Sequence, residues 1–292
     1  MRVSQKINKY LTALLVVATC LTAVSCGEYS ALQRTNDYDY KYEAAKAYFV
    51  EGKYSKAATL FYDLLGVMKG TAYAEESLYM LSMSEFCNKN YEIANNNFKK
   101  YCQSFPKGIY IEQAHYHAAL SLYKQTPDPR LDQTSTIKAM GAFQNFLDQY
   151  PYTSLRAQTQ DMIFALQDKL VEKECKSAQL YYDLGSYIMN CTYGGNNYEA
   201  CVVTAQNALR DYPYASADKR ERLAMLVLKA KYQLAVKSVE EKRIERYRDA
   251  IDEYYAFEND FPESKYMKEA KNMLSQAQAV VNHHKNTETE VN

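Results

Sequence analysis

The chain has 292 residues, enough for about two globular units or one elongated array. Hydrophobic residues make up 47% and charged residues 24%, which excludes a disordered, collagen-like or multiply membrane-spanning protein. Lys plus Arg and Asp plus Glu number 35 each, so the chain lacks the excess of positive charge that is typical of nucleic-acid-binding proteins. The chain has only 9 Gly, and neither phosphate-binding motif, GxGxxG or GxxxxGK[ST], occurs in it.

The first 25 residues have the pattern of a signal peptide. A basic start with Arg2, Lys6 and Lys9 precedes an apolar run that begins at Leu11 and is too short for a membrane span. Small residues at 23–25 then precede Cys26, which resembles the lipobox of bacterial lipoproteins. We therefore predict cleavage before Cys26 and lipidation of Cys26, followed by a linker over 26–37. Cys20 is a poorer candidate, and a plain secretory signal is the alternative.

Repeats begin after this linker. An aromatic residue precedes each of Pro106, Pro151, Pro213 and Pro262. A small residue lies twelve positions before each of these prolines, at Ala94, Ala139, Cys201 and Ala250; a fifth copy without the proline has Ala57. This spacing resembles the second helix of a tetratricopeptide repeat, in which small residues permit close helix packing and proline ends the helix.

The first helices of the repeats have a second period, of 37 residues. It relates Tyr42, Tyr79 and Tyr116, and it also relates Phe49, Phe86 and Tyr123. The fold class that follows is all-α, a right-handed α-solenoid of five tetratricopeptide-like helix pairs plus a C-terminal capping helix. Because the first helices line the inner groove of such arrays, these six aromatic residues are the predicted peptide-binding groove. Packing between repeats is the alternative for each of them.

The predicted boundaries follow from this register. N-terminal repeats one to three occupy 38–155, ending near 72, 108 and 155, with an insertion at 126–134 in repeat three. C-terminal repeats four and five and the capping helix occupy 156–282. They include one long helix over 154–188, a turn at 190–197, a charged connection at 240–246, and the cap from 264 to about 282. Residues 283–292 are a polar tail.

The sequence offers no catalytic constellation, so the chain is predicted not to be an enzyme. His115 and His117 lie about 200° apart on a helix and cannot share a metal, and neither a metal nor a cofactor is expected. Cys191 and Cys201 could form a disulfide after export, although Cys201 occupies a small packing position. Basic residues such as Lys219 and Arg222 alternate with acids, which suits protein contacts better than nucleic acid.

The match to one family rests on longer motifs. The lipobox is followed by YSALQRTNDYDYKY at 29–42, TPD at 126–128, LDQT at 131–134 and DYP at 211–213. The chain therefore resembles the BamD family of lipoproteins from the outer-membrane β-barrel assembly machinery, and its stretch 185–197 resembles the Bacteroidetes version.

The resemblance implies a scaffold anchored in the outer membrane by the lipid on Cys26, on the periplasmic face. It implies that the N-terminal repeats receive unfolded outer-membrane proteins and that the C-terminal repeats dock periplasmic domains of the barrel-forming subunit. A tetratricopeptide lipoprotein that coordinates peptidoglycan synthesis or division is the alternative. A glycan-binding lipoprotein is a third class, disfavoured because the chain has no Trp for sugar stacking.

Overall fold

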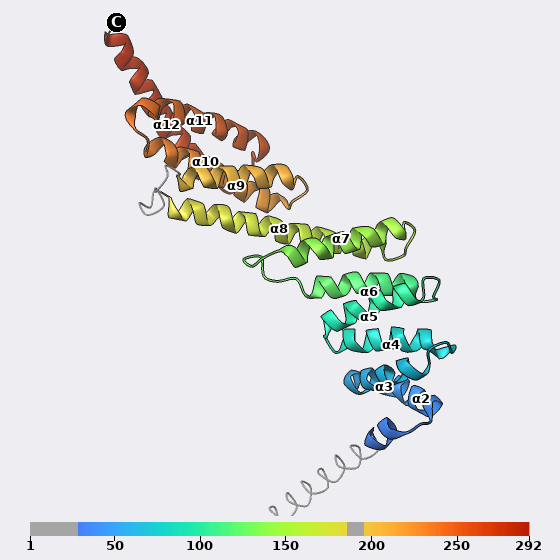
Figure 1. The fold of residues 1–292 in the computed structure, drawn as a ribbon. Helices are drawn as coiled ribbons and strands as arrows, with labels where there is room; N and C mark the ends of the chain where they lie inside the picture. Colours follow the sequence, from blue (N-terminus) through green and yellow to red (C-terminus); the bar gives the residue numbers. More distant parts are fainter. Residues whose placement is uncertain (1–28, 186–195, 292) are drawn as a thin grey trace, which may run out of the picture. The chain divides into compact units, whose positions relative to one another are not determined.

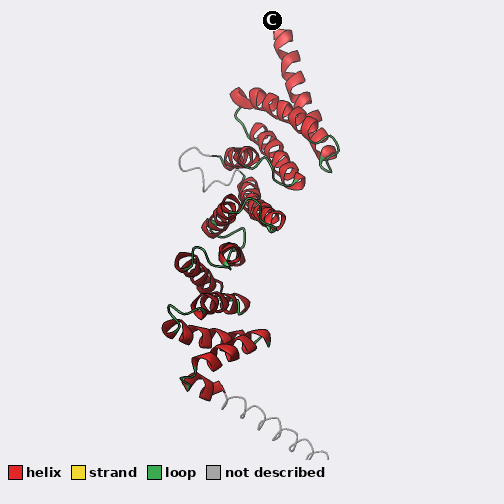
Figure 2. Ribbon diagram, turned by 90° about the vertical axis from the view of Figure 1, so that its right-hand side faces the viewer, coloured by secondary structure: helices red, strands yellow, loops and turns green. Residues whose placement is uncertain are grey.

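The computed structural model describes residues 29–185 and 196–291, and all the regular structure in these two ranges is helical (Figures 1 and 2). A short helical segment at 29–34 precedes eleven labelled helices. These are α2 (Tyr38–Val50), α3 (Tyr54–Val67), α4 (Tyr73–Cys87), α5 (Tyr91–Ser104), α6 (Ile111–Lys124), α7 (Thr134–Gln149), α8 (Arg156–Leu184), α9 (Asn197–Asp211), α10 (Ala217–Val236), α11 (Glu240–Asp260) and α12 (Met267–Val291). The predicted all-α class is confirmed.

Consecutive helices pack against one another, as expected for a tetratricopeptide-like solenoid. In the first half, α2, α3, α4, α5 and α6 follow one another in an unbroken series of neighbours (Figure 1). In the second half, α8 to α12 do the same, and α10 also touches both α8 and α12. Helices with short connections therefore form antiparallel neighbours, and each buries its apolar stripe against the next.

Contacts divide the chain into two compact units. The first unit contains residues up to Gln125 together with 148–150, and the second contains 126–147 and the residues from Pro151 onward. This division falls between α6 and α7, whereas the sequence grouped repeats one to three together up to residue 155. The grouping of repeats by function remains a prediction, and each unit is described below by itself.

The prolines end helices where the sequence predicted. Helices α5, α7, α9 and α11 each end two residues before a proline, and in three of them the intervening aromatic residue is the C-cap. Phe105, Tyr212 and Phe261 share nearly the same backbone conformation, with φ between −124° and −135° and ψ between 61° and 65°. The ring of the following proline disfavours helical ψ in the preceding residue, which accounts for this common ending.

The predicted small positions are buried. Ala57, Ala94, Ala139, Cys201 and Ala250 are all buried in the structure. So are the residues four positions later in each repeat, namely Phe61, Phe98, Phe143, Ala205 and Tyr254. Side chains of this size allow the second helix of each pair to approach its neighbours closely, as the spacing indicated.

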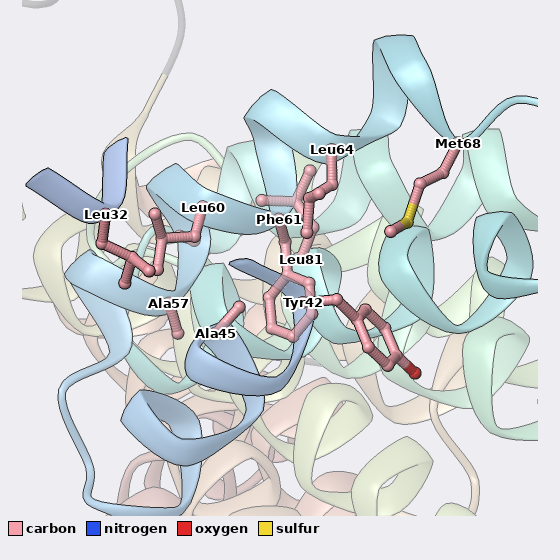
Figure 3. Close-up of a cluster of buried hydrophobic side chains, with 10 residues drawn as sticks. Leu32, Tyr42, Ala45, Ala57, Leu60, Phe61, Leu64, Met68 and Leu81 are labelled. Carbon is pink, nitrogen blue, oxygen red and sulfur yellow. The ribbon is translucent and has the colours of Figure 1, made fainter. Parts of the chain in front are cut away.

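The core of the first repeat shows how these positions work together. Tyr42 and Ala45 of α2 meet Ala57, Leu60 and Phe61 of α3 in one buried cluster (Figure 3). Leu81 of α4 joins this cluster, so the packing continues from repeat one into repeat two.

The turns inside the first two repeats have the same conformation. Gly52 follows α2 with φ +76°, and Lys89, 37 residues later, follows α4 with φ +65°. In both turns the next residue donates its backbone N–H to a carbonyl five positions back: Lys53 to Tyr48 at 2.8 Å, and Asn90 to Glu85 at 2.9 Å. The left-handed residue closes the helix by satisfying its last carbonyl groups.

The insertion at 126–134 is a loop of the second unit that hydrogen bonds hold in place. The buried Gln133 side-chain amide donates to the carbonyl oxygens of Asp128 at 2.8 Å and Leu131 at 3.0 Å, and its oxygen accepts from the Thr136 hydroxyl at 2.7 Å. The Lys169 ammonium of α8 donates to the Thr126 hydroxyl at 2.8 Å. These bonds tie the TPD and LDQT motifs to the helices of the second unit.

Two boundaries differ from the prediction. Residues 240–246 were predicted as a connection but form the start of α11, because they contain no Gly or Pro and because Glu240 and Glu241 favour a helix N-terminus. Helix α12 continues to Val291 instead of ending near 282, since no Gly or Pro follows Pro262. The polar tail at 283–291 is therefore helical.

Candidate functional site: the aromatic ladder of the first unit

The six predicted groove residues lie on three successive first helices. Tyr42 and Phe49 are on α2, Tyr79 and Phe86 on α4, and Tyr116 and Tyr123 on α6. All three helices belong to the first unit. The structure therefore brings the six residues into one array, but it buries them to different extents.

Tyr42 is a core residue, with 3% of its surface exposed. Its ring and that of Phe61 form a T-shaped pair with 6.3 Å between the ring centroids. The centroid of the Tyr73 ring lies 5.0 Å from that of Tyr42. The hydroxyl is buried and has no hydrogen-bond partner of good geometry among the described residues. Burial and the nearby carboxylate of Glu76 raise the pKa of Tyr42 well above its usual value.

Tyr79 packs against other rings but is only half-buried. It stacks on Tyr110 at 4.3 Å with an angle of 10° between planes, and Phe98 and Tyr101 approach it edge-on at 6.0 and 5.7 Å. Burial raises the pKa of Tyr79 to about 12, so its hydroxyl stays protonated at neutral pH. Tyr116 is 4% exposed, and burial likewise raises its pKa.

The second position of each helix is less enclosed. Phe49 meets Tyr54 edge-on at 5.4 Å, and Phe86 meets Tyr91 with the same separation. These two contacts are 37 residues apart, so the structure repeats them in successive helix pairs. Phe49, Phe86 and Tyr123 are all half-buried. Only this second set and Tyr79 therefore have ring surface that a ligand could reach.

The sequence reasoning missed a third set with the same period. Tyr73 packs on Tyr42, and Tyr110, 37 residues later, packs on Tyr79. Each residue lies at or just before the start of the next first helix, where it covers the ladder tyrosine of the preceding repeat. The spacing of Tyr73 and Tyr110 was the available signal, since it matches the spacing used to find the other two sets.

Glu75 fixes the connection between α5 and α6. One of its carboxylate oxygens accepts from the Tyr101 hydroxyl at 2.6 Å and from the backbone N–H of Ile109 at 2.7 Å. The backbone N–H of Tyr110 donates to the Tyr101 hydroxyl at 3.1 Å. Burial and the Glu75 carboxylate raise the pKa of Tyr101 well above its usual value. The polar network thereby positions Tyr110 over Tyr79.

The two histidines of α6 serve different contacts. His115 Nδ1 lies 2.9 Å from the Tyr150 hydroxyl, while His117 Nδ1 lies 2.8 Å from the Gln113 carbonyl oxygen. Burial lowers the pKa of both imidazoles. Across the described part of the chain, no group of three or more His, Cys, Asp or Glu side chains could hold a metal ion.

Of Cys26, Cys191 and Cys201, the structure describes only Cys201. Cys201 is buried and lies 4.0 Å from the Leu226 carbonyl oxygen, as expected for a packing thiol. Burial raises the pKa of Cys201 to about 12, so this thiol is not a nucleophile at neutral pH. Cys26 and Cys191 lie outside the described residues, so the lipidation and the disulfide remain predictions.

The basic residues at the start of α10 form ion pairs with α8. The Lys219 ammonium forms an ion pair with Asp168 of α8, and Arg222 pairs with Glu172 at 2.8 Å. Burial alone would raise the pKa of Glu172, but the charges of Arg222, Lys176 and Lys219 outweigh it and hold this pKa below its usual value. Both residues thus form ion pairs within the second unit, and their preference for protein over nucleic acid stays a prediction.

A more exposed feature of the second unit lies between α9, α10 and α11. A hollow of about 250 Å³ is lined by Val202, Val203, Leu234 and charged residues that include Lys231 and Arg246. Arg246 pairs with Glu199 at 3.0 Å, and the exposed Val203 places an apolar surface beside them.

None of the helices within the described ranges is long and apolar enough to span a membrane.

Comparison with known proteins agrees with this architecture. The protein named outer membrane protein assembly factor BamD from Rickettsia prowazekii (strain Madrid E) is 26% identical over 180 residues, which cover 60% of this chain and 70% of that protein. The model of the YfiO family, described as outer membrane lipoprotein, matches residues 35–192, which is more than half of the chain. The chain belongs to this family of outer membrane lipoproteins.

Proposed function

We propose that the chain is a lipid-anchored scaffold that assembles β-barrel proteins in the outer membrane. The observation that carries this proposal is the family match over 35–192, together with the name of the relative, an outer membrane protein assembly factor. The tetratricopeptide-like helix pairs support it, because such arrays present extended surfaces to other proteins. The lipid on Cys26 provides the attachment to the periplasmic face of the outer membrane.

In this proposal, the first unit receives unfolded outer-membrane proteins. Tyr42 and Tyr116 support the ladder from within the core, while Phe49, Phe86, Tyr79 and Tyr123 supply the ring edges that a ligand touches. An unfolded barrel strand exposes alternate apolar side chains, which half-buried aromatic residues at regular spacing can accommodate. Affinity is modest, because ordering a flexible strand offsets much of the contact energy.

A peptide titration tests the receiving role. The full-length chain with Cys26→Ala is titrated with a labelled peptide that carries the amphipathic, aromatic-terminated last strand of a barrel protein. Phe49→Ala together with Tyr123→Ala is expected to weaken binding by more than about 2 kcal/mol if these side chains are hot spots. Replacing Tyr79 and Tyr116 together is less informative, because the structure uses both in packing.

The matched control is Tyr62→Ala, which removes an aromatic side chain that is 70% exposed on α3, a second helix of a pair. This variant is expected to bind like the wild type. Unchanged affinity in a Phe49/Tyr123 variant that keeps its helicity, as measured by circular dichroism, would place the receiving surface elsewhere.

The second unit is proposed to dock the periplasmic domains of the barrel-forming subunit. Val203, exposed beside the Glu199–Arg246 pair, offers the apolar centre with a charged rim that protein interfaces use. In a pull-down from native membranes, Val203→Glu is expected to lose the barrel-forming subunit. Leu180→Glu introduces the same charge at an equally exposed residue of α8 and is expected to retain it. Retention by both variants would contradict docking at this hollow.

The alternative is a lipoprotein that coordinates peptidoglycan synthesis or division. The same pull-down separates the two functions, because that alternative predicts recovery of peptidoglycan enzymes without the barrel-forming subunit. The TPD and LDQT motifs favour the assembly function, because they are part of the resemblance to the BamD family.

A further inference from the structure

The segment just after the lipidation site is part of the first repeat and not a free linker. Leu32 of the helical segment 29–34 is buried in the same cluster as Leu60 and lies next to it (Figure 3). Tyr29 meets Tyr48 edge-on at 5.7 Å, and its hydroxyl lies 3.4 Å from the Lys56 carbonyl oxygen, which accepts its hydrogen bond. Contacts with both helices of the first pair therefore hold this segment.

The end of the segment is fixed as well. Lys41 of α2 is buried, and its ammonium donates to the Gln33 carbonyl oxygen at 2.8 Å. A cation at the C-terminal end of a helical segment is favourable because the carbonyl groups there carry partial negative charge. The segment 29–34 therefore moves with α2 and α3 as one body.

This packing leaves a very short tether to the lipid. Only two residues, Gly27 and Glu28, separate Tyr29 from Cys26, and the three Cα–Cα steps between them span at most about 11 Å when fully extended. If Cys26 carries the lipid, as proposed above, the first repeat is held within this distance of the membrane surface. A packed domain so close to its anchor must face the lipid head groups with one of its sides.

The adjoining surface has the composition of a membrane interface. A hollow of about 790 Å³ is lined by Ala31, Leu32, Tyr40, Tyr48 and Lys53, among others. Aromatic residues with a polar tip and lysines with long apolar stems are the side chains that settle at the level of lipid head groups.

The cations of this surface are paired with its aromatic residues. The Lys56 ammonium lies 5.0 Å from the centre of the Tyr29 ring and 5.3 Å from that of Tyr48, and the Lys53 ammonium lies 5.4 Å from Tyr48. Glu51 pairs with Lys53 at 2.7 Å, and the carboxylate of Glu43 also lines the hollow. The surface thus presents aromatic rings and ammonium groups together with the carboxylates of Glu43 and Glu51.

We propose that this N-terminal face, formed by residues 29–35 with Tyr40, Tyr48, Lys53 and Lys56, lies directly on the phospholipid head groups of the membrane that holds the anchor. The inference rests on the lipidation included in the proposed function. In this arrangement the lipid positions the first repeat at the bilayer surface and does not act as a flexible tether.

The absence of Trp makes a direct test possible, because one introduced Trp is the only such reporter in the chain. Tyr40→Trp places it in the N-terminal face, at a residue that is 63% exposed. Ile109→Trp places it at a residue that is 76% exposed in the connection between α5 and α6. Each lipidated protein is reconstituted into phosphatidylethanolamine/phosphatidylglycerol vesicles with or without bromine on the acyl chains, which quenches nearby Trp emission.

The expected result is a several-fold larger loss of emission for Tyr40→Trp than for Ile109→Trp. Equal losses in proteins that float with the vesicles would overturn the inference while leaving the lipid anchor intact. A protein that does not float, and whose N-terminal peptide carries no lipid by mass spectrometry, would instead contradict the anchor and with it the inference.

A second variant tests the role of the short tether. A flexible Gly/Ser insertion of about 12 residues between Glu28 and Tyr29 adds roughly 19 Å of mean reach. It is expected to preserve flotation and to reduce the quenching of the Trp at position 40. Quenching that persists undiminished would contradict the claim that the short tether positions the first repeat.

Discussion

Lys89 carries a conformation that suits glycine. Its φ of +65° belongs to the left-handed region, where the Cβ of an ordinary residue costs roughly 1–2 kcal/mol. The equivalent position in the first repeat is Gly52, at +76°. The helix end at this point requires a left-handed residue in both repeats, but only the first repeat supplies glycine for it.

We therefore expect Lys89→Gly to stabilise the protein by about 1 kcal/mol, as a higher midpoint in chemical denaturation monitored by circular dichroism. Gly52→Ala is the converse control and should destabilise by a similar amount. A lower midpoint for Lys89→Gly would show that the lysine side chain contributes more than the backbone strain removes.

Gly108 is required because of a close approach. A Cβ at this position would lie 2.5 Å from both the Glu75 carboxylate oxygen and the Tyr101 hydroxyl, and 3.0 Å from the Phe105 carbonyl oxygen. The network that positions Tyr110 over Tyr79 leaves no room for a side chain here.

Gly108→Ala is expected to destabilise the protein by roughly 1–3 kcal/mol, because it forces apart the hydrogen bonds of Glu75. Gly66→Ala in α3 is the matched control: a Cβ there meets nothing within 4 Å, and it should stabilise the helix by up to about 1 kcal/mol. Equal effects of the two variants on the thermal midpoint would show that the Glu75 network is loose.

Helix α6 makes the stability of the first unit depend on pH. His117 stacks on Phe98 at 5.4 Å and meets the edge of Phe86 at 5.5 Å, and burial lowers its pKa from 6.5. Because this pKa is lower in the folded protein than in the unfolded chain, the unfolded chain binds more protons once the pH falls below about 6.5. The contribution of neutral His117 is therefore complete above that pH and is lost below it.

The thermal midpoint of the wild type is thus expected to fall between about pH 7.5 and pH 5.5, more steeply than that of His117→Gln. His284→Gln, at an exposed residue of α12, should behave like the wild type. A wild type and a His117→Gln variant with the same pH profile would contradict the role assigned to His117.

Elements were predictable wherever their signal was local and repeated. The four prolines located four helix ends, and the small residues twelve positions earlier located the buried contacts, because both effects act through short-range geometry. The start of α11 was not predicted, because the polarity of residues 240–246 suggested a loop. Their helix propensity, with no Gly or Pro among them, favours the helix that the structure shows.

The candidate site was less predictable than the fold. A 37-residue period places Tyr42, Tyr79 and Tyr116 on equivalent faces, but period alone does not reveal what covers each ring. The covering residues Tyr73 and Tyr110 lie at the start of the following repeat, so the burial of Tyr42 and Tyr79 depends on contacts distant in sequence. The partners of Lys219 and Arg222, Asp168 and Glu172 of α8, are likewise distant in sequence.

At the scale of the whole molecule, the proposed attachment to the membrane is the lipid on Cys26. If the lipid on Cys26 is the anchor, as proposed, Cys26→Ala is expected to move the protein from the outer-membrane fraction to a soluble or inner-membrane-retained precursor. Cys20→Ala is the control and should fractionate like the wild type. Outer-membrane fractionation of Cys26→Ala would show that another feature anchors the chain.

The central claim is that this chain assembles β-barrels, and depletion in its own cell tests it most directly. The measured quantity is the amount of folded barrel protein in the outer membrane, read from the different gel mobilities of heated and unheated samples. Folded barrels are expected to decline as the chain is depleted, and the wild type and Tyr62→Ala are expected to restore them while Cys26→Ala is not. Unchanged barrel levels after complete depletion, with defects confined to peptidoglycan or division, would contradict the central claim.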